Sequence, residues 1–110
     1  MVKQGDIIKV DLNPKTGHEQ AGYRSAVVIS NNLFNQKAKL AIVCPITNTN
    51  NHFPLHIPLD SRTSTTGVIL CEHVKALDLN ARPYKVIEQL PIDLLKTVID
   101  VVFSEIEVFT

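Results

Sequence analysis

The chain has 110 residues, of which 45% are hydrophobic and 20% are charged, and its formal net charge is zero. This length suits one domain with one modest core, and the neutral balance argues against a protein that grips nucleic acid through bulk charge alone. No apolar run approaches the roughly 18–20 residues needed to span a bilayer, and the start lacks the apolar segment of a secretory signal, so we expect a cytoplasmic protein without a membrane partner.

Charge is distributed unevenly along the chain. Residues 1–40 carry six Lys/Arg against three acids, whereas residues 86–110 carry one lysine against five acids. The first strands and their loop are therefore the positive end of the molecule. A local basic surface of this kind suits a short single strand of nucleic acid rather than a duplex.

Two predicted strands flank a polar loop near the start of the chain. Gly5–Leu12 alternates apolar and polar residues, and Ser25–Ser30 is apolar and rich in β-branched residues, as strands are. Asn13-Pro14 ends the first of them. The loop Gly17–Arg24 gathers a histidine, a carboxylate, an amide and a guanidinium, which is more chemistry than a turn requires.

A short helix and a third strand follow. Asn31–Lys39 is predicted as a helix with Asn31 or Asn32 as its N-cap. Ala41–Thr47 is an apolar strand, in which Pro45 indicates a sheet edge or a bulge.

The second half predicts further strands and a terminal helix. Leu55–Leu59 is a weak strand, Gly67–Val74 a strong one and Lys85–Glu88 a short one. Over Pro91–Ile106 apolar residues recur every three or four positions, which predicts an amphipathic helix with Pro91 in its first helical position. The predicted fold is mainly β with α: a twisted antiparallel sheet, partly closed, with the helix packed against it.

Cys44 and Cys71 both fall inside predicted strands and have no close metal-ligand spacing. Buried reduced thiols are favoured, which suits the cytosol, with a disulfide between them as the alternative. Outside the loop with His18, the histidines His52, His56 and His73 add no spacing that builds a zinc site, so no metal or other cofactor is expected.

The order GD-x7-P-x2-G-x-EQ-x-G-x-R resembles the MazF/PemK (Kid) family of toxin ribonucleases, and it is formed here by Gly5-Asp6, Pro14, Gly17, Glu19-Gln20, Gly22 and Arg24. Three later stretches agree in order and spacing: Ala41–Thr47 (AIVCPIT), Thr65–Glu72 (TTGVILCE) and Val74–Leu79 (VKALDL). The resemblance covers nearly the whole chain. It implies a CcdB/MazF-like fold, that is an SH3-like barrel with a C-terminal helix, built as a two-fold homodimer.

By resemblance, the chain is a sequence-specific, metal-independent endoribonuclease that leaves a 2′,3′-cyclic phosphate and a 5′-hydroxyl on single-stranded mRNA. Arg24 would stabilise charge on the phosphoryl oxygens, because a guanidinium fork fits phosphate and stays charged, and Thr47 would assist it. Glu19 would take or relay the 2′-hydroxyl proton or fix the arginine, and His18 would be an accessory. Composition alone equally suits a loop ion pair for Arg24, a turn start for Thr47 and a solvated acid for Glu19.

Recognition of splayed RNA bases uses aromatic and amide groups. The candidate substrate-binding residues are His18, Gln20, Tyr23, Asn48, Glu72 and Lys75. Each also suits an ordinary surface position. The Kid branch carries an arginine two residues before the acid that matches Glu72, and Leu70 replaces it here, which favours the Arg24–Thr47 arrangement of the MazF branch. Ser25 replaces the family's usual proline, which restores a backbone donor and frees the loop exit.

The partners implied by the resemblance are single-stranded RNA, a second copy of the chain, and a MazE-like antitoxin whose acidic, disordered tail lies over the dimer. Three alternatives stay open. One is a non-catalytic toxin of the same fold that binds a protein, as the gyrase poison CcdB does, and another is an inactive paralogue. The third is an SH3-like adaptor that binds proline-rich peptides. The grooves of such adaptors are lined by several aromatic residues, and this chain has only two tyrosines and no tryptophan.

Overall fold

The computed structural model describes residues 1–12, 23–49 and 53–109. Within these ranges the elements are β1 (Asp6–Asp11), β2 (Tyr23–Val28), α1 (Asn32–Ala38), β3 (Ala41–Thr47), β4 (His56–Pro58), β5 (Val68–Leu70), the 3-10 helix η1 (Cys71–His73), β6 (Lys75–Leu77), β7 (Tyr84–Gln89) and α2 (Ile92–Ile106). The strand pairs are antiparallel. The predicted class, an antiparallel sheet with a C-terminal helix, is confirmed.

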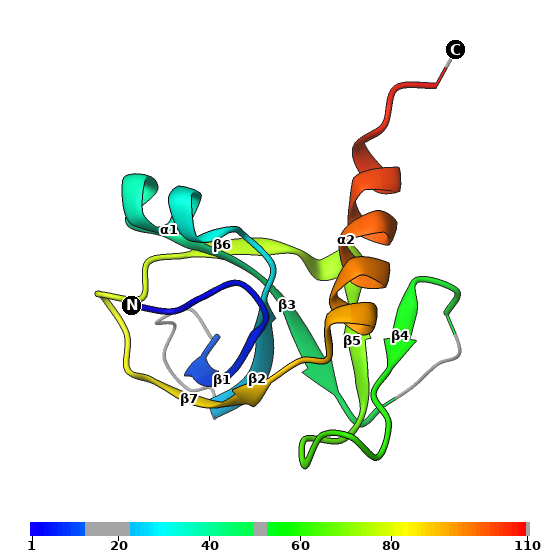
Figure 1. Cartoon of the computed structure of the whole chain (residues 1–110), viewed down its shortest axis with the longest axis horizontal. Coiled ribbons are helices and arrows are strands. Elements are labelled where there is room, and N and C mark those ends of the chain that lie inside the picture. Colours follow the sequence, from blue (N-terminus) through cyan, green and yellow to red (C-terminus); the bar gives the residue numbers. More distant parts are fainter. Residues whose placement is uncertain (13–22, 50–52, 110) are drawn as a thin grey trace, which may run out of the picture.

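The strands form one sheet in the order β4-β5-β3-β2-β1-β7, with β6 also pairing with β3. Over the described ranges this path begins at β4 and ends at β7, so the sheet is open and the expected partial closure is not present. Figure 1 shows α2 standing beside β4 and β5, while α1 and the N-terminus lie on the side of the molecule away from α2. None of the described helices is long and apolar enough to cross a membrane.

Both faces of the central strands are buried, because side chains alternate across a sheet. On one face Ile7 joins a helix-side core that α2 covers, which also contains Val27, Cys44, Ile46, Ile69, Leu95 and Val98. On the other face Ile8 and Val10 join an inner core, which also contains Val2, Ala26, Val28, Ala41, Val43 and Leu77. A residue at the end of β2 or β3 can therefore be assigned to one face by counting from these cores.

The helix ends partly follow the sequence signals. Asn31 is the N-cap of α1, and its Oδ1 accepts a hydrogen bond from the Phe34 amide at 2.8 Å, as predicted. Pro91 is the N-cap of α2 and not its first helical residue, because its ψ of 141° is still extended. Its fixed φ nevertheless leads directly into the helix.

The strand predicted over Gly67–Val74 is wrong in its second half, where β5 ends at Leu70 and η1 follows. Both β5 and β6 pair with β3, but in different registers. Ile69 lies opposite Ile46, which would bring residue 74 to Ala41, yet Ala41 pairs with Leu77. The shift of three residues equals the length of η1, so the 3-10 helix absorbs the mismatch between the two pairings.

Pro45 lies in a central strand and not at the predicted edge or bulge, because β3 pairs with β2 on one side and with β5 and β6 on the other. The described ladder to β6 covers residues 41–43 and the ladder to β5 covers residues 46–47. Pro45 falls in the gap between them. A residue without an N–H is tolerated there because no described neighbouring strand needs its donor.

The two cysteines, Cys44 and Cys71, are both buried in the helix-side core, and their thiols are free. A hydrogen bond with the Cys71 thiol, together with burial, raises the pKa of the Cys44 thiol above its ordinary value. Both sulfurs therefore act as small apolar groups in the core.

Candidate active site

Arg24 belongs to a strand and not to the predicted loop, because β2 begins at Tyr23, two residues before its expected start. It lies opposite Val10 of β1 in the ladder. Val10 is fully buried in the inner core, whereas Arg24 is exposed at the end of the sheet. The sheet fixes the base of the arginine, and its guanidinium end is left to solvent or a ligand.

Thr47 lies beside Arg24. The β2–β3 ladder pairs Ala26 with Pro45 and Ser25 with Ile46, and one further step in the same register brings Arg24 next to Thr47. Arg24 and Thr47 therefore project from the face of the inner core, and directly opposite side chains have Cβ atoms about 5 Å apart. The register, extended by this step, makes neighbours of the two residues that the sequence proposed as a pair, and their chemical role stays a prediction.

The end of β3 depends on a close approach by Gly67. This residue has a φ of 116°, which favours glycine. A Cβ there would lie 2.3 Å from the Thr47 carbonyl oxygen and 3.1 Å from Asn48 Oδ1. Beside it, the Thr66 hydroxyl donates to Asn48 Oδ1 at 3.0 Å, and the Thr49 amide donates to Thr47 Oγ1 at 3.1 Å. Thr66 and Gly67, in the loop before β5, thus contact Asn48 and Thr47 and fix the end of β3.

That loop is itself anchored at two points. Glu88 of β7 accepts hydrogen bonds from the amides and hydroxyls of Ser64 and Thr65, at 2.7–3.1 Å. Arg62 reaches Asp93 of α2 with two bonds of 2.9 and 3.0 Å, and it also pairs with Asp60. Burial on its own would raise the pKa of Glu88, but the hydrogen bonds from Thr65 and Ser64 prevail and lower it to about 2.

We expect the Glu88→Gln variant to have a free energy of unfolding that changes less between neutral and acidic pH than that of the parent protein. The Glu88 pKa is about 2 in the folded chain against an ordinary value of 4.5. The Glu88 contribution to stability is therefore fully present above pH 4.5 and is lost as the pH falls towards 2. At pH 7 the variant should lose about 1–2 kcal/mol of unfolding free energy. Urea titrations at pH 7 and pH 3 measure this, with Glu107→Gln as the exposed control, and equal losses at both pH values would contradict it.

The other predicted site residues are divided between the two faces. Tyr23 is exposed, but it lies opposite Asp11 on the face away from Arg24. Lys75 pairs with Val43, on the same face as Thr47 but level with a point four residues earlier in β3. Asn48 follows Thr47 directly. The candidates His18, Glu19 and Gln20 lie outside the described residues.

Glu72 lies in a different cluster. Its Oε2 is 2.8 Å from Nε2 of His56, whose side chain is only 6% exposed, and 3.7 Å from Nε2 of His73. Burial would raise the pKa of Glu72, but hydrogen bonds from its own amide and from His56 prevail and lower it. On α2, burial together with the nearby Glu72 carboxylate raises the pKa of Glu105. The Glu72 carboxylate is therefore held by two histidines. Glu72 follows Val68, the β5 partner of Thr47, by four residues in the chain.

Ser25 occupies a ladder position and not a loop exit, which corrects the sequence interpretation. It pairs with Lys9 on one side and with Ile46 on the other. Its side chain points to the face opposite Arg24. The replacement of the usual proline therefore lies inside the sheet, on the face opposite Arg24.

Sequence reasoning did not identify the residues that support Thr47. Gly67 ends a run of Ser and Thr, which indicates a turn. Its role nevertheless depends on a positive φ and on a close approach to the Thr47 backbone that only the fold reveals. Glu88 and Arg62 gave no local signal. Over the described ranges no group of three or more His, Cys, Asp or Glu side chains could hold a metal ion.

Comparison with known proteins shows the family. Residues 3–102 match the model of the PemK-like, MazF-like toxins of type II toxin–antitoxin systems, so the chain belongs to that family. It is 31% identical to Endoribonuclease PemK of Escherichia coli over 102 residues, which cover 89% of this chain and 77% of the relative. It is 37% identical to Endoribonuclease toxin MazF of Escherichia coli K12 over 78 residues, which cover 71% and 69%.

The fold is similar to solved structures of the same kind. A MazE–MazF crystal structure from Deinococcus radiodurans matches with a TM-score of 0.86 and 29% sequence identity, covering 94% of both chains. A MazF structure from the same organism matches with a TM-score of 0.83 and 29% identity, again over 94% of both chains.

Proposed function

We propose that this chain is the toxin of a toxin–antitoxin pair and acts as a sequence-specific, metal-independent endoribonuclease on single-stranded RNA. The proposal is supported by the β2–β3 register, because one further step beyond the Ser25–Ile46 pair puts Arg24 opposite Thr47. The names of the curated relatives, which are endoribonucleases, support the same activity.

The proposed reaction is an internal transfer at phosphorus. The ribose 2′-oxygen attacks the adjacent phosphorus, the bond from phosphorus to the 5′-oxygen breaks, and the products carry a 2′,3′-cyclic phosphate and a 5′-hydroxyl. Arg24 donates to the phosphoryl oxygens as their negative charge grows, and Thr47 donates its hydroxyl to the same group. Glu19 takes the 2′-hydroxyl proton with His18 as its accessory, and Arg24 assists protonation of the 5′-oxygen as it leaves.

The proposed partners follow from the same relatives. The MazE–MazF structure from Deinococcus radiodurans supports an antitoxin as the partner of this chain. From the family resemblance we also expect an acidic tail on that antitoxin and a two-fold homodimer in the cytoplasm. The exposed guanidinium of Arg24, near the start of β2, would attract such a tail and an RNA strand alike.

Cleavage is expected to proceed at an unchanged rate in excess EDTA. In this proposal the guanidinium of Arg24 supplies the positive charge that a metal ion supplies in metal-dependent nucleases. Purified protein would be incubated with a long single-stranded RNA, with and without chelator, and cleavage followed by gel electrophoresis. Activity that appears only after addition of Mg²⁺ or Mn²⁺ would refute metal independence, and no cleavage in either condition would favour a protein-binding toxin or an inactive paralogue.

A further inference from the structure

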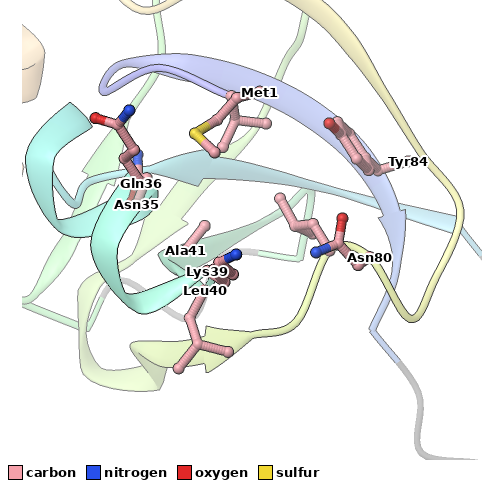
Figure 2. A pocket seen from close by; sticks show the side chains of 10 residues that line it. Met1, Asn35, Gln36, Lys39, Leu40, Ala41, Asn80 and Tyr84 are labelled. Atoms are coloured by element: carbon pink, nitrogen blue, oxygen red, sulfur yellow. The ribbon is translucent and has the colours of Figure 1, made fainter.

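A pocket lies over the inner core, away from the loop before β5 that supports Thr47. It is a pocket of about 440 Å³ between the N-terminus, the end of α1, the start of β3 and the segment before β7. Figure 2 shows side chains from all four of these segments around it. This volume lies in the range of small-molecule sites, which is roughly 300–1,000 Å³.

The lining of the pocket combines an apolar floor with side-chain amides, a phenol and one cationic side chain. Val2 and Ala41 of the inner core form its floor. Around the opening lie the amide of Asn80, the ring of Tyr84 and the ammonium-bearing side chain of Lys39 (Figure 2). None of the described residues that line it is acidic. A planar ring with hydrogen-bonding edges and an attached negative charge, that is a nucleotide, matches this set.

The walls of the pocket are held in place before any ligand binds. Asn35 at the back of α1 is buried, and it bonds through its amide group to the hydroxyl and the carbonyl of Ser30. The segment before β7 is tied to β1, because Arg82 donates to the Asp11 carbonyl at 2.8 Å. A fixed shape lowers the entropic cost of binding.

Lys39 occupies an unusual backbone position. It follows α1 with a φ of 58°, and it is the one non-glycine residue with positive φ in the described ranges. Glycine is the usual residue at such a helix end. A lysine adopts this backbone conformation less readily than a glycine, but it places a cation at the pocket. Stabilisation of the helix C-terminus is the simpler explanation, and the experiment below separates the two.

The pocket lies on the same face as the proposed active site. Val10 of β1 pairs with Arg24 on one side and with Tyr84 of β7 on the other, so the three residues form a row across three strands. Strands are about 4.8 Å apart, which puts Tyr84 about 10 Å from Arg24 along this row. A single strand of a few nucleotides is long enough to span this distance.

We propose that this pocket is a subsite that binds one nucleotide of the single-stranded RNA, away from the scissile phosphate. Tyr84 stacks on the base, Asn80 contacts the base edge and Lys39 contacts a phosphate. The inference rests on the proposed nuclease function for its choice of RNA, and a free nucleotide is the other source of the same chemistry.

Binding is tested in an Arg24→Ala background, which keeps the phosphate-binding residue of the active site out of the measurement. The four 5′-ribonucleoside monophosphates, and inorganic phosphate as a comparison, are titrated while backbone amide signals are followed by NMR. At least one nucleotide should shift the signals of Lys39, Asn80 and Tyr84 in a saturable manner. Tyr84→Ala should weaken that binding roughly 5- to 100-fold, because a base–aromatic stack is lost, whereas Tyr84→Phe should keep it.

Lys39→Gly separates the binding role from the structural one. Glycine relieves the positive φ, so the melting temperature should hold or rise, while nucleotide binding should fall roughly 10-fold with the loss of a charged donor. Lys37→Ala removes the same charge from the last turn of α1, outside the pocket, and should leave binding unchanged. Equal affinity in Lys39→Gly, Tyr84→Ala and the parent protein, or no saturable shift at millimolar nucleotide, would overturn the inference.

Cleavage kinetics distinguish the two sources of nucleotide. With Arg24 intact, Tyr84→Ala should raise KM for RNA and leave kcat nearly unchanged, because the subsite contributes uniform binding. Nucleotide binding without any change in KM would contradict the RNA assignment and favour a free nucleotide. If the chain cleaves no RNA at all but the Tyr84-dependent shifts occur, the nuclease proposal fails and the nucleotide site stands.

Discussion

Replacing Arg24 with alanine is expected to lower RNA cleavage by about 10²–10³-fold, the usual cost of removing one preorganised donor from a developing negative charge. If the guanidinium also assists protonation of the leaving oxygen, roughly another 10²-fold is lost. Folding should change little, because Arg24 is exposed at the end of its strand. Single-turnover rates and melting temperatures measured on the same preparations test both parts.

Two variants sharpen the Arg24 result. Arg24→Lys should restore little activity, since a point charge cannot make the two-pronged contact with phosphate. Lys9→Ala removes an exposed cation from the adjacent strand but from the opposite face, because Lys9 pairs with Ser25. It should retain nearly full activity. Near-normal cleavage by Arg24→Ala, or a loss that merely follows unfolding, would mean that the active site lies elsewhere, with Glu72 and His73 next to be tested.

Gly67→Ala is expected to destabilise the protein by about 2–4 kcal/mol, since it combines backbone strain with overpacking. The new Cβ would lie 2.3 Å from the Thr47 carbonyl oxygen, at a φ of 116°. The strand end that carries Thr47 has to move, so cleavage should fall further than the loss of folded protein explains. Urea unfolding and activity at a temperature where the variant is folded measure the two effects.

Gly5→Ala is the matched control for Gly67. Gly5 also has a positive φ, of 93°, but a Cβ there meets only flexible side-chain atoms of Gln89 and Leu95 at 3.3 Å. This variant should show the strain without the backbone collision, and it should leave Thr47 in place. Equal losses of stability and activity in the two variants would contradict the supporting role assigned to Gly67.

The sequence predicts best where a periodic pattern is also a structural unit. Ala41–Thr47 is one strand with the predicted bounds, and α2 fills the predicted terminal helix apart from Pro91. Gly67–Val74 failed because apolar composition does not reveal that one partner strand is paired in two registers. Pro45 failed for a related reason, since the gap in pairing that accommodates it is a property of three strands together.

The candidate site shows the same division. The family resemblance singled out Arg24 and Thr47, and the β2–β3 register makes them neighbours. It gave no indication that Glu72 would be held by His56, because that contact joins residues 16 positions apart. Nor did it point to Tyr84 and Lys39, which meet at one pocket only after β7 and α1 have packed around the inner core.

The most direct test of the proposed chemistry is the identity of the ends that the enzyme leaves. Wild-type protein would be incubated in EDTA with a defined single-stranded RNA that contains a mapped cleavage site, and both fragments analysed by mass spectrometry. Attack by the 2′-oxygen predicts a 2′,3′-cyclic phosphate on the upstream fragment and a 5′-hydroxyl on the downstream one. A 3′-hydroxyl with a 5′-phosphate would contradict this account, because those ends require attack by water.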